Sequence, residues 1–210
     1  MRITKYTHAC LRLEHGGGVL VIDPGVFSEP ESLDGADAVL ITHEHFDHID
    51  IEKLRAAAAK QPALTVYTHP DVEAQLVDLD AEKFAVAPGD TFVAAGMTVR
   101  ARGGQHAIIH SDIPQIVNVG YLIESPDGPI YHPGDSFFVP EDEVATLFVP
   151  VSAPWLKLAE AIDFTRAVRP DRAFALHDSL LVEAGQQMVT GHMTRLSGTH
   201  YTRLQPGESV

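Results

Sequence analysis

Short runs of apolar and β-branched residues, separated by turn residues, recur through the first two thirds of the chain and predict a strand-rich fold. The triple glycine at residues 16–18 stands between two such runs. Because it lacks the spacing of a phosphate-binding loop, it predicts a hairpin turn, as does the Ser-Pro-Asp-Gly segment at residues 125–128. The expected strands are residues 3–7, 10–14, 19–22, 39–41, 65–68, 84–87, 91–93, 97–102, 116–124 and 129–132.

Helical patterns interrupt these strands and alternate with further strands in the last third of the chain. Four consecutive alanines give the first helical segment a high helix propensity, and Pro62 ends it. The expected helices are residues 49–60, 71–78, 156–168 and 182–196, and strands at 147–151 and 173–176 alternate with the last two. The order of meander, helix, meander, helix predicts an α+β (α/β) fold of two packed sheets with helices outside.

The composition fits one domain spanning residues 1–210, because 45% of the residues are hydrophobic and can build a sizeable core. No run of about 18 apolar residues is present, and the first residues lack an apolar signal region, so we expect a soluble, cytoplasmic protein without membrane contact. The lone Cys10 excludes an internal disulfide. The net charge is −14 and no Lys/Arg cluster appears, so we expect no nucleic-acid partner.

Twelve histidines are many for this length, and three of them stand with an aspartate directly after the expected strand at 39–41. Imidazole and carboxylate groups are ligands suited to zinc, manganese and iron. Side chains two positions apart point the same way, whereas adjacent side chains diverge. The simplest geometry therefore sends His43 and His45 to one metal ion, and Asp47 and His48 to a second ion nearby.

Three further candidate ligands stand at the ends of later strands. His106 follows the strand at 97–102 through a Gly-Gly turn, Asp135 follows the strand at 129–132 through Pro-Gly, and His177 follows the strand at 173–176. Ligands placed at strand ends along one rim have the rigid positions that a two-metal site requires. We therefore predict that these residues complete the site begun by the His-rich segment.

In this order the residues resemble the metallo-β-lactamase superfamily, whose hallmark His-x-His-x-Asp-His stands at residues 43–48. The resemblance spans nearly the whole chain and implies a four-layer αββα sandwich with two divalent ions at one edge of the sheets. These ions would be zinc, with manganese or iron as alternatives. The implied ligands are His43, His45 and His106 for one ion and Asp47, His48 and His177 for the other, with Asp135 bridging. The chain looks most like the branch containing ascorbate-6-phosphate lactonase-like proteins.

Five more residues are candidates for supporting roles. Asp23 ends a strand before Pro-Gly and either caps a turn or orients a ligand. His8 ends the first strand and is a candidate for proton transfer or substrate contact, against the alternative of a satisfied strand histidine. His110 is a candidate extra ligand or substrate contact, and His132 is expected to be buried or to support a ligand. Asp178 either bonds a neighbour of the site or is a solvated turn carboxylate.

Two divalent ions would lower the pKa of a shared water toward about 7 and so provide a hydroxide nucleophile. We expect Asp135 or His8 to carry the proton to the leaving group. The predicted function is a binuclear metal-dependent hydrolase that cleaves an ester, lactone, amide or phosphodiester bond in a small metabolite. An iron-containing redox enzyme and a non-catalytic, metal-binding regulatory module remain alternatives. The sequence leaves the oligomeric state open, including a homo-oligomer.

Overall fold

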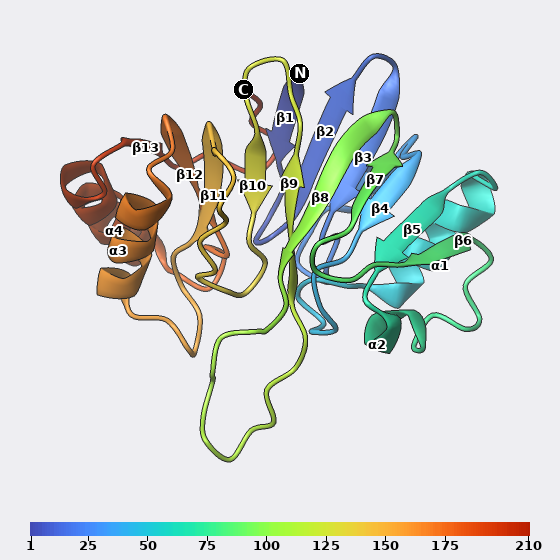
Figure 1. The fold of residues 1–210 in the computed structure, drawn as a ribbon, viewed down its shortest axis with the longest axis horizontal. Helices are drawn as coiled ribbons and strands as arrows, with labels where there is room; N and C mark the ends of the chain where they lie inside the picture. The colour runs from blue at the N-terminus through green and yellow to red at the C-terminus, as the bar shows by residue number, and fades with distance from the viewer.

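Two β-sheets form the centre of the computed structural model, which describes all 210 residues (Figure 1). The first sheet contains, in spatial order, β1 (Arg2–Lys5), β2 (Leu11–His15), β3 (Gly18–Ile22), β4 (Ala38–Leu40), β5 (Thr65–Thr68) and β6 (Glu82–Ala85). The second contains, in spatial order, β13 (His200–Thr202), β12 (Arg172–Leu176), β11 (Thr146–Pro150), β10 (Ile130–His132), β9 (Val119–Ile123), β8 (Met97–Gly103) and β7 (Thr91–Ala94).

Each sheet is part antiparallel and part parallel. Strands β1 to β3 pair antiparallel, and β3 to β6 pair parallel. In the second sheet β7 to β10 pair antiparallel, and β10 to β13 pair parallel. Helices connect the parallel strands, namely α1 (Ile51–Lys60), α2 (Pro70–Glu73), α3 (Leu158–Val168) and α4 (Glu183–Leu196). Because parallel strands end at the same edge of a sheet, the loops that follow them gather there.

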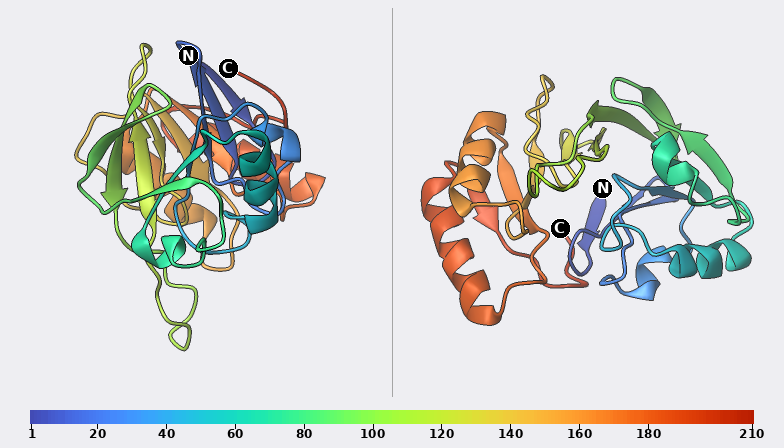
Figure 2. Two further views of the ribbon diagram at one scale, coloured as in Figure 1. Left: turned by 90° about the vertical axis from the view of Figure 1, so that its right-hand side faces the viewer. Right: turned by 90° about the horizontal axis from the view of Figure 1, so that it is seen from below.

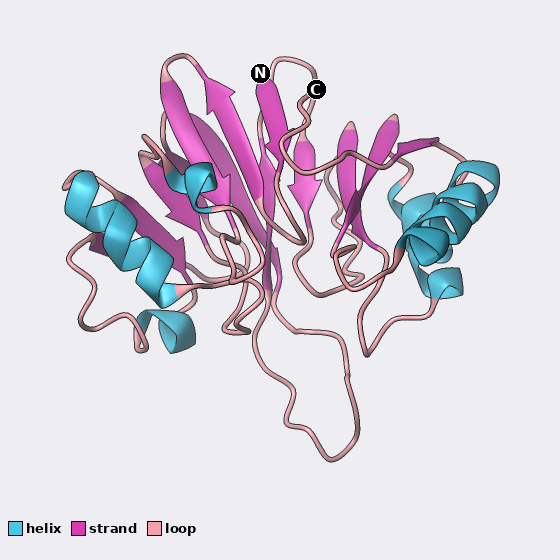
Figure 3. Ribbon diagram, turned by 180° about the vertical axis from the view of Figure 1, so that it is seen from behind, coloured by secondary structure: helices cyan, strands magenta, loops and turns pink.

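The buried apolar side chains form three clusters. The central cluster joins both sheets, with Leu40 from the first sheet and Phe148 from the second. A second cluster packs Leu54 of α1 on the outer face of the first sheet, and a third packs Phe164 of α3 and Met193 of α4 on the second. The helices consequently lie on the two outer sides (Figures 2 and 3). The predicted αββα sandwich is confirmed.

Most expected elements form, and the differences have local causes. The helix predicted at 71–78 stops at Glu73, because Leu76 and Leu79 are buried through successive turns rather than through one continuous helix. The strand predicted from residue 116 begins at Val119, since the residues before it return from a long loop. The short β13 and the 3-10 helix η1 (Pro30–Leu33) were not predicted. None of the helices has the length and apolar character that a membrane crossing requires.

The loop between β8 and β9, residues 104–118, extends well beyond the body of the molecule (Figure 1). Its two arms are joined at the base, where His106 N donates to Ile116 O at 3.0 Å. Two arginines of β8, just before the loop, bind Asp142. Its carboxylate accepts hydrogen bonds from Arg100 Nη1 at 2.9 Å and from Arg102 Nε at 2.6 Å. This ion pair network fixes the end of β8, from which the loop departs.

The network gives a pH-dependent prediction. The hydrogen bond from Arg102 is the main cause that lowers the pKa of Asp142 to about 2. A carboxylate with a depressed folded-state pKa contributes stability above its unfolded pKa of about 4, and this contribution is lost as the pH falls toward 2. We expect Asp142→Asn to reduce the free energy of unfolding by about 1 kcal/mol at pH 7 and by less at pH 3, measured by urea denaturation.

Asp163→Asn is the matched control, because this carboxylate is 76% exposed and its closest cation, Arg166 Nη1, is 3.9 Å away. Its stability should equal that of the wild type at both pH values. A cost of Asp142→Asn that stays constant between pH 7 and pH 3 would contradict the role given to this carboxylate.

Candidate metal centre

The predicted ligands converge at the edge where several strands of both sheets end. His43, His45, Asp47 and His48 lie in the turn that follows β4, and His106 lies at the base of the loop after β8. Asp135 follows β10 and His177 follows β12 directly. The parallel register of β3 with β4 and of β11 with β12 aligns these strand ends, so residues far apart in sequence meet at one rim.

The donor atoms form two groups, and within each group all the atoms lie within 4.8 Å of one another. One group is His43, His45, His106 and Asp135, and the other is His8, Asp47, His48 and His177. The turn therefore sends its first two histidines to one group and its Asp-His pair to the other, as the sequence predicted. Each group has the number and kind of donors that a tetrahedral zinc site uses.

Asp135 lies between the two groups. Its Oδ1 is 3.1 Å from His48 Nε2, and its Oδ2 is 3.4 Å from His106 Nε2 and 3.3 Å from His177 Nε2. The carboxylate therefore faces one histidine of the first group and two of the second. This position fits the bridging role that the family resemblance implies for Asp135, and the role stays a prediction.

The histidine rings are held from behind by oxygen atoms. His48 Nδ1 lies 2.6 Å from Asp23 Oδ2, His106 Nδ1 lies 2.6 Å from Ala107 O, and His177 Nδ1 lies 2.5 Å from Ser152 O. An outer oxygen that accepts the Nδ1 proton leaves the Nε2 lone pair free, and it fixes the orientation of the ring. These are the contacts that metal-binding histidines normally make.

The inward-facing atoms lack hydrogen-bond partners. His48 Nε2, His106 Nε2, His177 Nε2 and Asp135 Oδ1 are buried and unpartnered, although each lies close to other polar atoms. Such atoms are costly to bury unless a further group satisfies them. Their concentration at one point, with imidazole and carboxylate chemistry, fits one or more divalent cations.

The electrostatics of the cluster lead to the same conclusion. Asp23, Asp47 and Asp135 have only histidines as possible cationic partners, and no Lys or Arg pairs with them. Burial raises the pKa of Asp135, but His48 and His177 hold it well below its usual range. Burial lowers the pKa of His177, whereas Asp135 and Asp47 raise it to about 9. Negative charge therefore collects where only imidazolium or a bound cation can balance it.

His8 is part of the cluster rather than a strand histidine. Its Nε2 lies 3.1 Å from Asp47 Oδ2, its Nδ1 lies 2.7 Å from Ser179 Oγ, and its ring centroid is 3.8 Å from that of His177. Burial lowers the pKa of His8 to about 4, although the hydrogen bond that Asp47 accepts from the His8 ring opposes this shift. The structure thus brings His8 to the rim, as expected for a proton-transfer candidate.

Asp23 has a supporting position behind the first turn. It is fully buried, and its carboxylate accepts from Thr42 N at 2.8 Å and from Thr42 Oγ1 at 2.7 Å, in addition to facing His48. Thr42 Oγ1 also lies 2.9 Å from His43 Nδ1, so one carboxylate is linked to both groups. Sequence reasoning missed Thr42, whose only signal was its place between a buried strand and His43.

His132 supports the turn that carries Asp135. It is buried, its Nε2 lies 2.9 Å from Ala9 O, and its Nδ1 accepts from Gly134 N at 3.1 Å. Gly134 has φ +62°, and a Cβ there would lie 2.2 Å from Asn118 Oδ1. Asn118, which sequence reasoning also missed, accepts from Asp135 N at 2.9 Å. The turn before Asp135 is therefore fixed on both sides.

The structure does not bring the other two candidates into the cluster. The His110 side chain is 63% exposed on the long loop, and its Nδ1 accepts from Asp112 N. Asp178 is buried and binds Arg203 Nε at 2.7 Å and Lys5 Nζ at 3.5 Å. It is thus neither a solvated turn carboxylate nor a direct partner of the cluster. Its cations instead hold the chain just after His177.

Backbone strain is concentrated at the same rim. Five residues other than glycine have positive φ, and three of them are His8 (67°), Asp23 (50°) and His177 (57°). Side chains other than glycine rarely adopt this conformation, and it persists only where the surroundings determine it. These three positions are ones that point a donor or its support into the centre.

A cavity of about 270 Å³ opens directly over the cluster. His45, Asp47, His106, Asp135 and His177 contribute to it, and Trp155 forms part of its wall. Trp155 Nε1 donates to Asp135 Oδ2 at 2.9 Å, so this tryptophan is a pocket residue that also contacts the central carboxylate.

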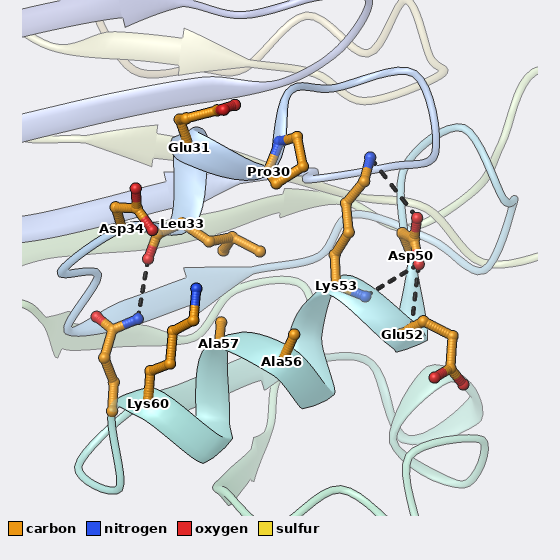
Figure 4. A pocket seen from close by; sticks show the side chains of 11 residues that line it. Pro30, Glu31, Leu33, Asp34, Asp50, Glu52, Lys53, Ala56, Ala57 and Lys60 are labelled. Atoms are coloured by element: carbon orange, nitrogen blue, oxygen red, sulfur yellow. Dashed lines mark hydrogen bonds and ion pairs between the residues drawn. The ribbon is translucent and has the colours of Figure 1, made fainter.

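A different cavity, of about 420 Å³, lies between η1 and α1 and contains no histidine (Figure 4). Lys53 lies along it, and its Nζ donates to Gly25 O at 2.8 Å and to Ser28 O at 2.6 Å. Phe27 in this segment lines the cavity over the cluster, with its ring centroid 5.1 Å from that of His8. The second cavity thus contains a structural contact that positions one wall of the first.

Comparisons with known proteins agree with this geometry. A family model described as a β-lactamase superfamily domain matches residues 2–177. Protein Rv0786c of Mycobacterium tuberculosis is 40% identical to this chain, and the alignment covers 100% of this chain and 99% of that protein. A UPF0173 metal-dependent hydrolase of Aeropyrum pernix is 31% identical, over 64% of this chain and 61% of that protein. The solved structure of Igni18, a metallo hydrolase of Ignicoccus hospitalis, superposes with a TM-score of 0.77 at 20% sequence identity. The superposition covers 100% of this chain and 97% of that one, so the two proteins share the fold.

The position of Asp23 gives a prediction on metal affinity. Asn at this site keeps one acceptor oxygen but turns an NH₂ group toward donors, so the ring of His48 loses its anchor. We expect Asp23→Asn to weaken zinc binding by about 10- to 100-fold, measured by competition with a chromogenic chelator. Asp37→Asn is the matched control, because Asp37 also accepts from a backbone N–H, that of Val19, but does not touch the cluster. Equal zinc affinity in the two variants would refute the anchoring role.

Proposed function

Because this chain belongs to the β-lactamase superfamily and is a metal-dependent hydrolase, we propose that it uses two divalent ions to cleave an ester, lactone or phosphodiester bond in a small metabolite. The observation that supports two ions is the division of the donors into two groups, in which the Asp135 carboxylate of one group also faces His48 and His177 of the other. A single ion would leave the donors of the other group buried without partners.

The proposed ligand set of five histidines and two aspartates suits zinc, which we assign first, with manganese or iron as alternatives. When bound, divalent ions supply Lewis acidity, which lowers the pKa of a water toward about 7 and polarises a carbonyl or phosphoryl oxygen. His43, His45 and His106 would hold one ion, and Asp47, His48 and His177 the other. Asp135 would contact both, with its orientation fixed by Trp155 and Asn118.

The remaining groups of the rim act on protons and on water. His8 lies behind Asp47, with its Nε2 3.1 Å from Asp47 Oδ2 and its Nδ1 2.7 Å from Ser179 Oγ, so it can relay a proton through Asp47, which lines the cavity. Asp135 is the second candidate for this step. The apolar wall that includes Phe27 and Trp155 limits the access of bulk water. We also propose that the partner is a small molecule rather than nucleic acid, given the net charge of −14, and that the protein acts in the cytoplasm.

Metal content provides the direct test of the two-ion proposal. Protein purified without added metal should contain two divalent ions per chain by elemental analysis. The double variant His43→Ala/Asp47→Ala removes one donor from each group and should lose most of this metal. The control His110→Ala/Asp112→Ala changes an exposed pair of the same chemistry and should retain both ions. Unchanged metal content in the first variant would exclude the proposed site.

The same preparation separates the alternatives. Bound iron with visible absorbance and no hydrolysis would support a redox enzyme. Bound metal without hydrolysis of any ester, lactone or phosphodiester would support a regulatory module.

His8 provides a separate prediction on catalysis. Removing a general acid or base typically costs about 10²- to 10⁴-fold in rate, so His8→Ala should lower kcat by at least about 100-fold. Because the other group members remain, the variant should still bind two ions. Loss of metal in parallel with loss of turnover would show instead that His8 is a ligand. His110→Ala, on the exposed loop, should match the wild type in both measurements.

A further inference from the structure

The walls of the cavity over the cluster differ sharply in character from its floor. The floor consists of the histidine and aspartate side chains of the metal centre. The walls are apolar and come from five separate loops, and their residues are Phe27, Phe46, Ile109, Pro154, Trp155 and Leu180. A substrate that reaches the floor must therefore place the rest of its structure against apolar side chains.

The walls also lack positive charge. None of the 15 Lys and Arg residues lines this cavity. The basic side chains of the surrounding segments are engaged elsewhere, since Lys5 and Arg203 bind Asp178 and Lys53 binds backbone carbonyls. Phosphate groups on a substrate are normally met by Arg or Lys donors. A phosphorylated group beyond the reacting bond would find no such partner here.

Several wall residues are exposed although they are large and apolar. Phe46 is 63% exposed, Leu180 is 53% exposed and Phe27 is 38% exposed. Exposed apolar side chains grouped around a polar floor indicate a surface that a ligand covers. The volume of about 270 Å³ is slightly below the range of about 300–1,000 Å³ typical of sites for drug-sized ligands, so the ligand is small.

Resting on the proposed hydrolase function, we infer that the substrate is a small molecule whose part beyond the reacting bond is an apolar, uncharged acyl or alkyl group. The floor would bind the reacting group, and Phe27, Phe46 and Leu180 would cover the apolar part. The walls would discriminate against substrates that carry a phosphate remote from the reacting bond.

Trp155 allows a binding test that does not depend on turnover. It is the only tryptophan of the chain and lies in the cavity wall, so its fluorescence reports on occupancy. The zinc-loaded, full-length protein is titrated with N-alkylacetamides of increasing chain length as uncharged probes. We expect the Kd to fall about fourfold for each added methylene until the cavity is filled. A phosphate at the far end of the longest chain should weaken binding at least tenfold.

A charge substitution in the wall sharpens the test. Leu180→Lys should weaken binding of the alkyl amide and strengthen binding of its phosphorylated counterpart. The ratio of the two affinities should therefore fall or reverse relative to the wild type. Val182→Lys is the matched control, because Val182 is 77% exposed two residues away and does not line the cavity. It should leave the ratio of the two affinities close to that of the wild type.

The outcomes are distinguishable from those for the proposed function. A Kd independent of chain length, or stronger binding of the phosphorylated probe by the wild type, would overturn the inferred substrate class. Hydrolysis of 4-nitrophenyl hexanoate faster than of the acetate in kcat/KM would support it. Failure to hydrolyse any ester would count against the hydrolase proposal, whereas the binding series would still decide whether the cavity prefers uncharged apolar groups.

Discussion

The carboxylate of Asp23 is completely buried, and it binds Thr42 through two hydrogen bonds and faces His48 Nδ1 at 2.6 Å. Thr42 Oγ1 also contacts His43 Nδ1, so a single acidic group fixes one histidine from each half of the centre. A buried carboxylate of this kind is stable only when donors surround it. The orientation of the two rings is therefore tied to the satisfaction of one buried charge.

The architecture makes this arrangement possible because both sheets end their parallel strands at the same rim. Strands β4, β10 and β12 supply the turns that carry the His-rich segment, Asp135 and His177, and β8 leads to His106. The resulting centre contains several buried donors without partners and three strained backbone positions. Neither feature stabilises the fold, so both are explained best by a bound cation that satisfies the donors.

The sequence predicted the chemistry of the centre more completely than its support. His43 to His48 could be read from a short motif, and His106, Asp135 and His177 from their places after apolar strands. Thr42 and Asn118 escaped notice, because their roles depend on contacts across 19 and 17 residues that no local pattern records. The prediction of His110 as a ligand or substrate contact was misleading for a related reason. His110 is close to His106 in the sequence, but the loop between β8 and β9 carries its side chain into solvent. The strands were predictable from apolar runs, whereas the short β13 lacked one.

The long loop after β8 shows how chemistry and specificity are divided in this protein. At its base, Ala107 N donates to Asp135 O at 2.8 Å, which holds His106 beside the central carboxylate. Only three residues after His106, Ile109 lines the apolar wall of the cavity. His106 is thus fixed by backbone hydrogen bonds, whereas Ile109 lies where the loop begins to leave the body of the molecule. A substitution at Ile109 can therefore alter which substrate fits without displacing the donors beneath it, whereas Trp155, which bonds Asp135, belongs to both the wall and the centre.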